Sequence, residues 1–458
     1  MNRSRDNSKV SPARMAAFEV LGGTRRPEQV YAKDLLESQF QKIQLSDPDR
    51  SLATELVYGV LRHLITLDHI VSCFSSRKLK RIEHSLLDAL RLGLYQILFL
   101  EKIPASAAVD ETVKLVRERI GERAVGFANG LLRSTLRDIG WKTSSAGDDR
   151  ARMLPVGENR EAVFTRPVFS EAVDDPICYL NLVLAHPRWM VERWMDRFGL
   201  EVTERICHSN NQRPPLHVRW RSSEPPPDEW RPIEGFPDMF LIDHGGAVSN
   251  LPGYADGSLV VQGSASARAV RMLDIQPGMR VLDVCAAPGT KTVHAADLAG
   301  DGGCVLAVDK SLWRMKKLKE NLSRLRIMSV YGLVADAARF GGWLKGDFKR
   351  ILVDVPCSNT AELARRVEVR HRLRPEEIDS LSRPSEILVE EGGAGEDLVV
   401  LSGPSHAEEV AKGMATSVVA ASTSRESALR VQGRLSGPEF RVYTSLDVPG
   451  VELGGALK

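Results

Sequence analysis

The chain has 458 residues, of which 43% are hydrophobic and 27% are charged, and its formal net charge is +2. This length exceeds one ordinary core and predicts two to four domains in a soluble globular protein. The near-neutral total does not exclude a nucleic-acid partner, because such binding depends on where Lys and Arg cluster.

The cysteine pattern argues against a zinc site, against a disulfide framework and for a reducing cytoplasm. Six cysteines are scattered without a Cys-x-x-Cys pair, namely Cys73, Cys178, Cys207, Cys285, Cys304 and Cys357. Residues 1–15 are basic and polar and lack the apolar core of a signal peptide. The most apolar predicted helix, 86–100, carries Asp88 and Arg91 and is too short to span a bilayer, so we expect protein, not membrane, around it.

Residues 10–141 predict a domain made only of helices. Leu52, Leu56, Val60 and Leu64 recur at every fourth position and give one apolar face at helical period. A short basic run at 75–81 is more typical of a solvated surface, and a phosphate contact is the functional alternative.

A linker and a small connector are predicted next. Residues 142–174 are polar, contain Pro and Gly and show no period, which is typical of a linker. Over 175–262 we expect a small α+β domain, with a helix over 186–199 that ends at Gly199 and a strand over 214–220. Trp189, Trp194 and Phe198 are interpreted as core residues rather than as stacking platforms for bases.

From 263 to 390 the pattern alternates strand and helix. This alternation predicts a doubly wound α/β domain of Rossmann-like architecture, with a parallel sheet covered by helices. In such a sheet, ligands bind beyond the carboxyl ends of the strands.

Small or acidic residues follow three successive predicted strands. The run "CAAPGTK" (285–291) has small side chains that let backbone N–H groups approach a ligand. Asp309 comes 20 residues after Gly289, where a carboxylate accepts bonds from ribose hydroxyls, and Asp336 ends the next strand. Close packing or helix capping would explain each feature alone. Their recurrence predicts a nucleoside-containing cofactor, although neither a Walker loop nor G-x-G-x-x-G is present.

The ordered motifs "VLDVCAAPGTKT", "VLAVDKS", "VADA" and "ILVDVPCSNT" resemble the S-adenosylmethionine-dependent RNA cytosine-5 methyltransferases of the Sun/NOL1 type. The N-terminal helices resemble the NusB-like RNA-binding domain of the bacterial small-subunit ribosomal RNA branch. The resemblance implies S-adenosylmethionine as cofactor and ribosomal RNA as partner. The cofactor-site positions that it implies are Cys285, Ala286, Ala287, Pro288, Gly289, Thr290, Lys291, Asp309, Asp336 and Asp354.

The same resemblance implies a covalent mechanism at cytosine. A thiolate adds to carbon 6 and so turns carbon 5 into a nucleophile toward the methyl group. Family members use two cysteines: the thiol of Thr-Cys-Ser adds to the ring, and the Pro-Cys thiol, Cys357 here, helps release the product. Asp354 would hold the cytosine edge. No Thr-Cys-Ser and no cysteine follow Cys357.

Residues 391–458 instead resemble part of NAD(P)-dependent glycerol-3-phosphate dehydrogenase, with Lys458 at the position of its catalytic lysine. Since no G-x-G-x-x-G turn precedes this segment, we expect no dehydrogenase activity and interpret the chain as a fusion of two gene fragments. The strand-like runs at 397–404, 416–422 and 440–445 could fill the vacant sheet positions. Without the second thiol, we expect cofactor binding but a loss of turnover on the order of 10⁶.

Two other functions remain open at this stage. DNA cytosine-5 methylation would need Cys357 alone, because there a Pro-Cys thiol is the nucleophile. A non-catalytic RNA-binding protein would use only the N-terminal helices. For the methyltransferase we expect a monomer without a bound metal.

Overall fold

The computed structural model describes residues 9–25, 31–143, 150–157, 159–170, 174–243, 248–336, 348–354, 362–376, 400–402, 416–421, 424–435 and 440–445. The chain forms two compact units. We call them the helical unit, Met1–Arg213 with Glu362–Leu373, and the sheet unit, Pro214–Ala361 with Arg374–Lys458.

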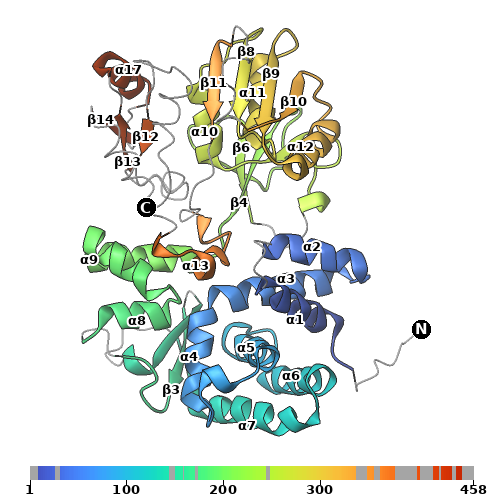
Figure 1. The fold of residues 1–458 in the computed structure, drawn as a ribbon, viewed down its shortest axis with the longest axis vertical. Helices are drawn as coiled ribbons and strands as arrows, with labels where there is room; N and C mark the ends of the chain where they lie inside the picture. The colour runs from blue at the N-terminus through green and yellow to red at the C-terminus, as the bar shows by residue number, and fades with distance from the viewer. Residues whose placement is uncertain are drawn as a thin grey trace. The chain divides into compact units, whose positions relative to one another are not determined.

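The first part of the helical unit is helical, as the sequence predicted, with seven α-helices among its described residues (Figure 1). They are α1 (Pro12–Thr24), α2 (Ala32–Lys42), α3 (Asp47–Arg62), α4 (Leu64–Phe74), α5 (His84–Phe99), α6 (Ala105–Arg119) and α7 (Glu122–Asp138). Helix α3 starts at a serine cap, where the Ser46 side chain accepts a hydrogen bond from the Asp49 N–H.

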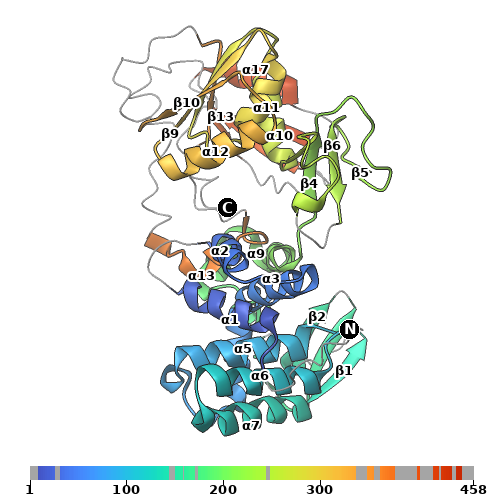
Figure 2. The ribbon, with the colours of Figure 1, turned by 90° about the vertical axis from the view of Figure 1, so that its right-hand side faces the viewer.

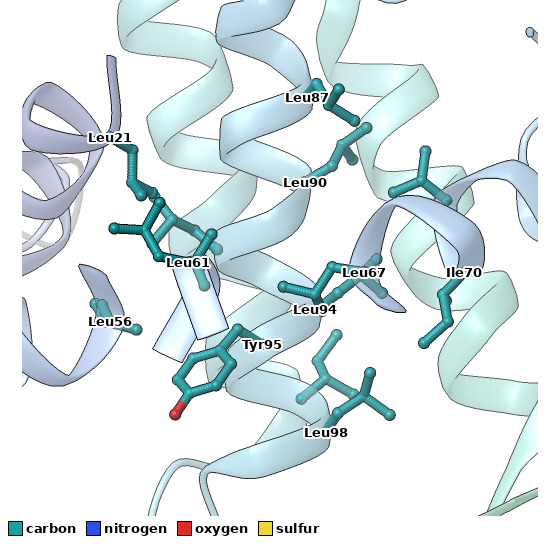
Figure 3. Packing of buried hydrophobic residues seen from close by; sticks show 14 of the residues in the cluster. Leu21, Leu56, Leu61, Leu67, Ile70, Leu87, Leu90, Leu94, Tyr95 and Leu98 are labelled. Carbon is teal, nitrogen blue, oxygen red and sulfur yellow. The ribbon is translucent and has the colours of Figure 1, made fainter. Parts of the chain in front are cut away.

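Helix α5 lies at the centre of this bundle and is buried from Leu86 to Leu98. Figure 3 shows leucines of α5, such as Leu90 and Leu94, facing residues of the surrounding helices. The expectation that the two charged residues of α5 are buried in protein is confirmed. Arg91 bonds to Asp88 at 2.9 Å and to Asp68 of α4 at 2.6 Å, so each buried charge has a partner.

Within the described residues, no single helix has the length and apolar composition that crossing a membrane requires. Helices α3 and α4 meet that criterion only when taken together, and they are bent by 75° relative to each other.

The predicted linker 142–174 contains regular structure instead. Strands β1 (Ile139–Thr143), β2 (Met153–Gly157) and β3 (Arg160–Phe164) form an antiparallel sheet in the order β1-β3-β2. Leu154 and Phe164 are buried in the core of the helical unit. The polar composition concealed these strands because few of their residues are buried, only Met153 and Leu154 in β2 and only Ala162 and Phe164 in β3.

The helical unit continues with two further helices, α8 (Pro176–Val183) and α9 (Arg188–Asn211). Gly199, the predicted end of a helix, is a break inside α9 with φ of 74°. Trp194 is buried, and Trp189 and Phe198 pack against the same core, as predicted.

The last part of the helical unit comes from much later in the chain. Residues Glu362–Leu373 include the short helix α13 (Val369–Arg372) and place Leu363 and Val367, both fully buried, in the helical core. Arg370 is also fully buried. It donates to Asn211 Oδ1 at 2.9 Å and to the carbonyl groups of Arg62, Ala185, Asn210 and Leu363.

The sheet unit begins with a small antiparallel sheet in the order β5-β6-β4-β7. Its strands are β4 (Leu216–Trp220), which was predicted, β5 (Arg231–Pro232), β6 (Met239–Ile242) and β7 (Leu259–Val261).

A parallel sheet in the order β10-β9-β8-β11 follows and confirms the predicted α/β domain (Figures 1 and 2). Its elements are α10 (Ser264–Met272), β8 (Arg280–Val284), α11 (Thr290–Ala299), β9 (Cys304–Asp309), α12 (Leu312–Arg324), β10 (Val330–Val334) and β11 (Arg350–Val353). Val281, Val305 and Leu352 pack on α10 and α11, because the buried strands present apolar residues to the helices.

The small sheet is tied to the parallel sheet by a cluster of charges. Arg219 and Arg221 both bond to Asp297 on α11, at 2.6 Å and 2.7 Å. Arg219 also donates to Gln262, and Gln262 contacts His294 of α11 at 3.0 Å. These contacts therefore fix α11, the helix that starts at the predicted cofactor loop, to the small sheet.

The C-terminal strands form a sheet of their own. Strand β13 (Thr416–Ala421) pairs with β14 (Phe440–Ser445) in parallel through α17 (Arg425–Leu435), and β12 (Val400–Ser402) pairs with β13 antiparallel. The expectation that these strands could fill positions beside β11 is wrong for the described residues, where β11 pairs only with β8. A strand-helix-strand segment satisfies its pairing locally, which explains the separate sheet.

Candidate active site

The carboxyl ends of three adjacent strands bring most of the predicted site residues together. Strand β8 lies between β9 and β11, so the loop from Cys285, Asp309 and Asp354 follow neighbouring strands. The chain continues from β8 to β9 on one side and places β11 on the other. A crevice at such a reversal of strand order is the usual ligand site of an open α/β sheet.

The loop after β8 makes a sharp, close-packed turn. Cys285 has φ of 69° and Gly289 has φ of 104°, and Ala287 is only 2% exposed. A Cβ at Gly289 would lie 2.1 Å from Leu318 Cδ1, so this position admits glycine alone. Helix α11 starts directly afterwards and directs its first backbone N–H groups toward the strand ends.

Asp309 is held firmly at the end of β9. Its Oδ2 accepts a hydrogen bond from the Ala287 N–H at 3.2 Å, and its Oδ1 accepts one from the Ser311 N–H at 2.9 Å. Arg314 of α12, which the sequence reasoning missed, lies 3.3 Å from Oδ2 and also donates to the Ala287 carbonyl. The sequence feature that could have identified Arg314 is an arginine in the first turn of the helix that follows Asp309.

Lys291 and Asp354 link the start of α11 to the end of β11. Lys291 Nζ lies 2.6 Å from Asp354 Oδ2, and the Asp354 side chain is 55% exposed. This carboxylate is therefore reachable from solvent while its position is fixed by the lysine.

Asp283, inside β8, is a second residue that the sequence reasoning missed. It is 1% exposed, and its Oδ2 accepts from Thr292 Oγ1 at 2.6 Å. Burial raises its pKa to about 7, partly offset by the Thr292 hydrogen bond. Its Oδ1 has no hydrogen-bond partner within the described residues. The sequence feature that could have identified Asp283 is a single acidic residue within the apolar run "RVLDV" (280–284).

The thiol at this site is not activated. Cys285 is half-buried, and burial, followed by the negative charge of Asp309, raises its thiol pKa. A raised pKa disfavours the nucleophilic thiolate. The structure thus offers no support for Cys285 as a replacement nucleophile.

Two predicted residues remain. Asp336 is exposed and follows β10, the strand beside β9, and the N–H of the preceding Ala335 donates to the Asp309 carbonyl at 3.2 Å. Cys357 lies outside the described residues. Among the described residues, no group of three His, Cys, Asp or Glu side chains could hold a metal ion.

Family models match four parts of the chain. The NusB family matches residues 11–137, and the 16S rRNA methyltransferase RsmB/F family matches 270–392. A ferredoxin-like domain of RsmF/B-like methyltransferases matches 186–223. The N-terminus of NAD-dependent glycerol-3-phosphate dehydrogenase matches 360–428, so this resemblance starts earlier than the sequence suggested and overlaps the methyltransferase match.

Curated relatives match along most of the chain. The probable ribosomal RNA small subunit methyltransferase B of Bacillus subtilis (strain 168) is 30% identical over 369 residues, which are 77% of this chain and 75% of the relative. The ribosomal RNA small subunit methyltransferase B of Cronobacter sakazakii is 30% identical over 357 residues, 75% of each chain.

The crystal structure of PH0851 has the same fold, with a TM-score of 0.62 at 21% identity, covering 86% of this chain and 83% of that one. The fold, the strand-end cluster and the extent of the sequence matches agree. This chain belongs to the ribosomal RNA small subunit methyltransferase B family.

Proposed function

We propose that the sheet unit binds S-adenosylmethionine and that its reaction is methyl transfer to carbon 5 of a cytosine in 16S ribosomal RNA. The observation that carries this proposal is the cluster of the 285–291 loop, Asp309 and Asp354 at adjacent strand ends. The cofactor would supply the methyl group from its sulfonium.

The residues present fit such a cofactor. Gly289, with φ of 104°, forms the turn from which α11 starts, and the backbone N–H groups at the start of a helix suit an anionic or polar group of a ligand. Asp309 offers a buried carboxylate to ribose hydroxyls. Asp283 Oδ1, which has no hydrogen-bond partner among the described residues, would accept from an ammonium or hydroxyl group of the ligand.

The target base would have to leave its stack to reach Asp354, so unpaired or splayed RNA is the expected substrate form. The Asp354 side chain is 55% exposed, which supports a role in contacting such a base. Methylation at carbon 5 needs a thiolate at carbon 6, a new carbon–methyl bond, loss of the proton from carbon 5, and departure of the thiol. Cys357 would serve the last step in the family scheme.

We propose that turnover in this chain is severely impaired. The sequence after residue 357 contains no cysteine that could add to the ring. The half-buried Cys285, with its raised pKa, is a poor substitute. A loss on the order of 10⁶ follows from removing a covalent nucleophile.

The test combines cofactor binding with methyl transfer. S-adenosylhomocysteine binding is measured by calorimetry on the full chain, and radiolabelled methyl transfer is measured on 16S RNA and on cytosine-containing DNA. We expect binding with almost no transfer. A chimaera whose residues from 383 onward are replaced by those of the Bacillus subtilis relative should regain RNA methylation.

Each part can fail separately. Normal turnover by the parent chain would disprove the impairment, and absence of ligand binding would disprove the cofactor site. Transfer to DNA alone would favour the DNA methyltransferase alternative.

A second candidate is a non-catalytic RNA-binding protein. The NusB family match and the complete core of the helical unit support it, because RNA binding there needs no thiol. Tight RNA retention without S-adenosylhomocysteine binding would favour this function.

A further inference from the structure

Arg314 contacts two residues of the predicted cofactor site, Asp309 and Ala287, which also bond to each other. It lies 3.3 Å from Asp309 Oδ2 and donates to the Ala287 carbonyl, while the Ala287 N–H donates to the same Oδ2. Each member comes from a different segment: the loop after β8, the end of β9 and the first turn of α12. The guanidinium therefore bridges the two strand ends that would hold a nucleoside.

The partners of Asp309 differ in how easily they can leave. Two of them are backbone N–H groups, of Ala287 and Ser311, which the loop and the helix start hold in place. The third is a long side chain that is 38% exposed, whereas the Asp309 side chain is 2% exposed. Of the three partners, only the guanidinium can leave the carboxylate without moving the backbone.

We propose that Arg314 occupies the place of ribose hydroxyls on Asp309 and is displaced by them. This inference rests on the proposed cofactor site. Arg314 is then a specificity-determining residue, because only a sugar with hydroxyl donors can replace the ion pair that the guanidinium gives up. A deoxyribose would leave a buried carboxylate short of donors, which is costly.

The sign of the expected effect separates this role from a supporting one. If Arg314 competes with the ligand, Arg314→Met should bind S-adenosylhomocysteine about fivefold more tightly, because a partly exposed ion pair is worth up to about 1 kcal/mol. If it only supported the loop, the same variant should bind more weakly. Arg314→Lys keeps the charge, but an ammonium group cannot bridge Asp309 Oδ2 and the Ala287 carbonyl oxygen. We therefore expect roughly threefold tighter binding of S-adenosylhomocysteine by this variant.

The experiment is a binding cycle on the full chain by calorimetry. S-adenosylhomocysteine and its 2′,3′-dideoxy analogue are each titrated into the parent, Arg314→Met and Arg314→Lys chains. Lys316→Met, which removes an exposed positive charge from the same helix, is the matched control. The gain should be confined to the hydroxyl-bearing ligand and absent from the control.

Three outcomes overturn the proposal. One is weaker or unchanged binding of S-adenosylhomocysteine by both Arg314 variants. Another is an equal gain for both ligands, which would mark a general charge effect. The third is failure of the parent to bind either ligand, which removes the cofactor site itself and is distinct from the first two. Should Arg314→Met not fold, Arg314→Lys decides between the first two outcomes.

Discussion

Mild acid should destabilise the helical unit, because three of its histidines are held neutral. Burial, followed by the positive charge of Arg370, lowers the pKa of His186 well below 6.5. Burial and the charges of Arg62 and Arg370 do the same for His63, and burial and Arg370 lower the pKa of His371 to about 3.

The geometry explains why a second proton is disfavoured at these rings. His186 Nδ1 lies 2.6 Å from the Leu184 carbonyl, so the other nitrogen, Nε2, would take the added proton. Within the described residues this Nε2 has no partner. His371 Nε2 likewise faces the Leu61 carbonyl at 2.6 Å.

The sign and size follow from linkage. A histidine with a depressed folded pKa gives full stability above the unfolded value of 6.5, and that stability is lost as the pH falls. Between pH 6.5 and 5, one fully neutral histidine costs about 1.6 kcal/mol of unfolding free energy, and three cost about 5 kcal/mol. His186 is completely buried, while His63 and His371 keep partial exposure, so we expect a loss of about 2 to 5 kcal/mol.

The measurement is urea denaturation at several pH values, followed by pulsed hydrogen exchange in peptides of α5. His371→Gln keeps a donor for the Leu61 carbonyl and should lower the pH slope by up to a third. His84→Gln removes an exposed histidine of α5 and is the matched control. A helical unit equally stable at pH 6.5 and pH 5 would refute the reasoning.

Three further predictions concern single residues. Arg370→Met should destabilise the helical unit by about 3 to 5 kcal/mol, since five oxygens lose a buried donor; a urea midpoint within error of the parent would contradict this. Gly59→Ala should cost about 1 to 3 kcal/mol because its Cβ would lie 1.9 Å from the Tyr95 ring, whereas Gly130→Ala on α7, with open space, should gain about 0.5 to 1 kcal/mol; thermal unfolding compares them, and equal effects would exclude the steric cause. Asp283, with a raised folded pKa of about 7, loses stability as the pH rises from 4 toward 7, so Asp283→Asn should stabilise the sheet unit by about 1 to 3 kcal/mol at pH 8 and little at pH 4; urea titrations at both values test this, and an equal gain at both would count against it.

The sequence alone determined the order and the class of the elements. Helical periodicity around Leu52 and Leu56, and the alternation of strand and helix after residue 263, are local patterns, and both correspond to structure. The small-residue turn at 285–289 and Asp309 were identifiable because a close backbone turn and an acid at a strand end follow from residue type.

Other features depend on contacts between residues distant in the chain, and only the tertiary structure decided them. Arginine side chains usually lie on the protein surface. Arg370 is nevertheless buried, because the carbonyl groups at the ends of α3 and α9 lie together around it. Arg314 reaches Ala287 and Asp309 only once β8 and β9 are neighbours. The separate C-terminal sheet follows from which strand pairs with which, and period-2 patterns do not encode the partner.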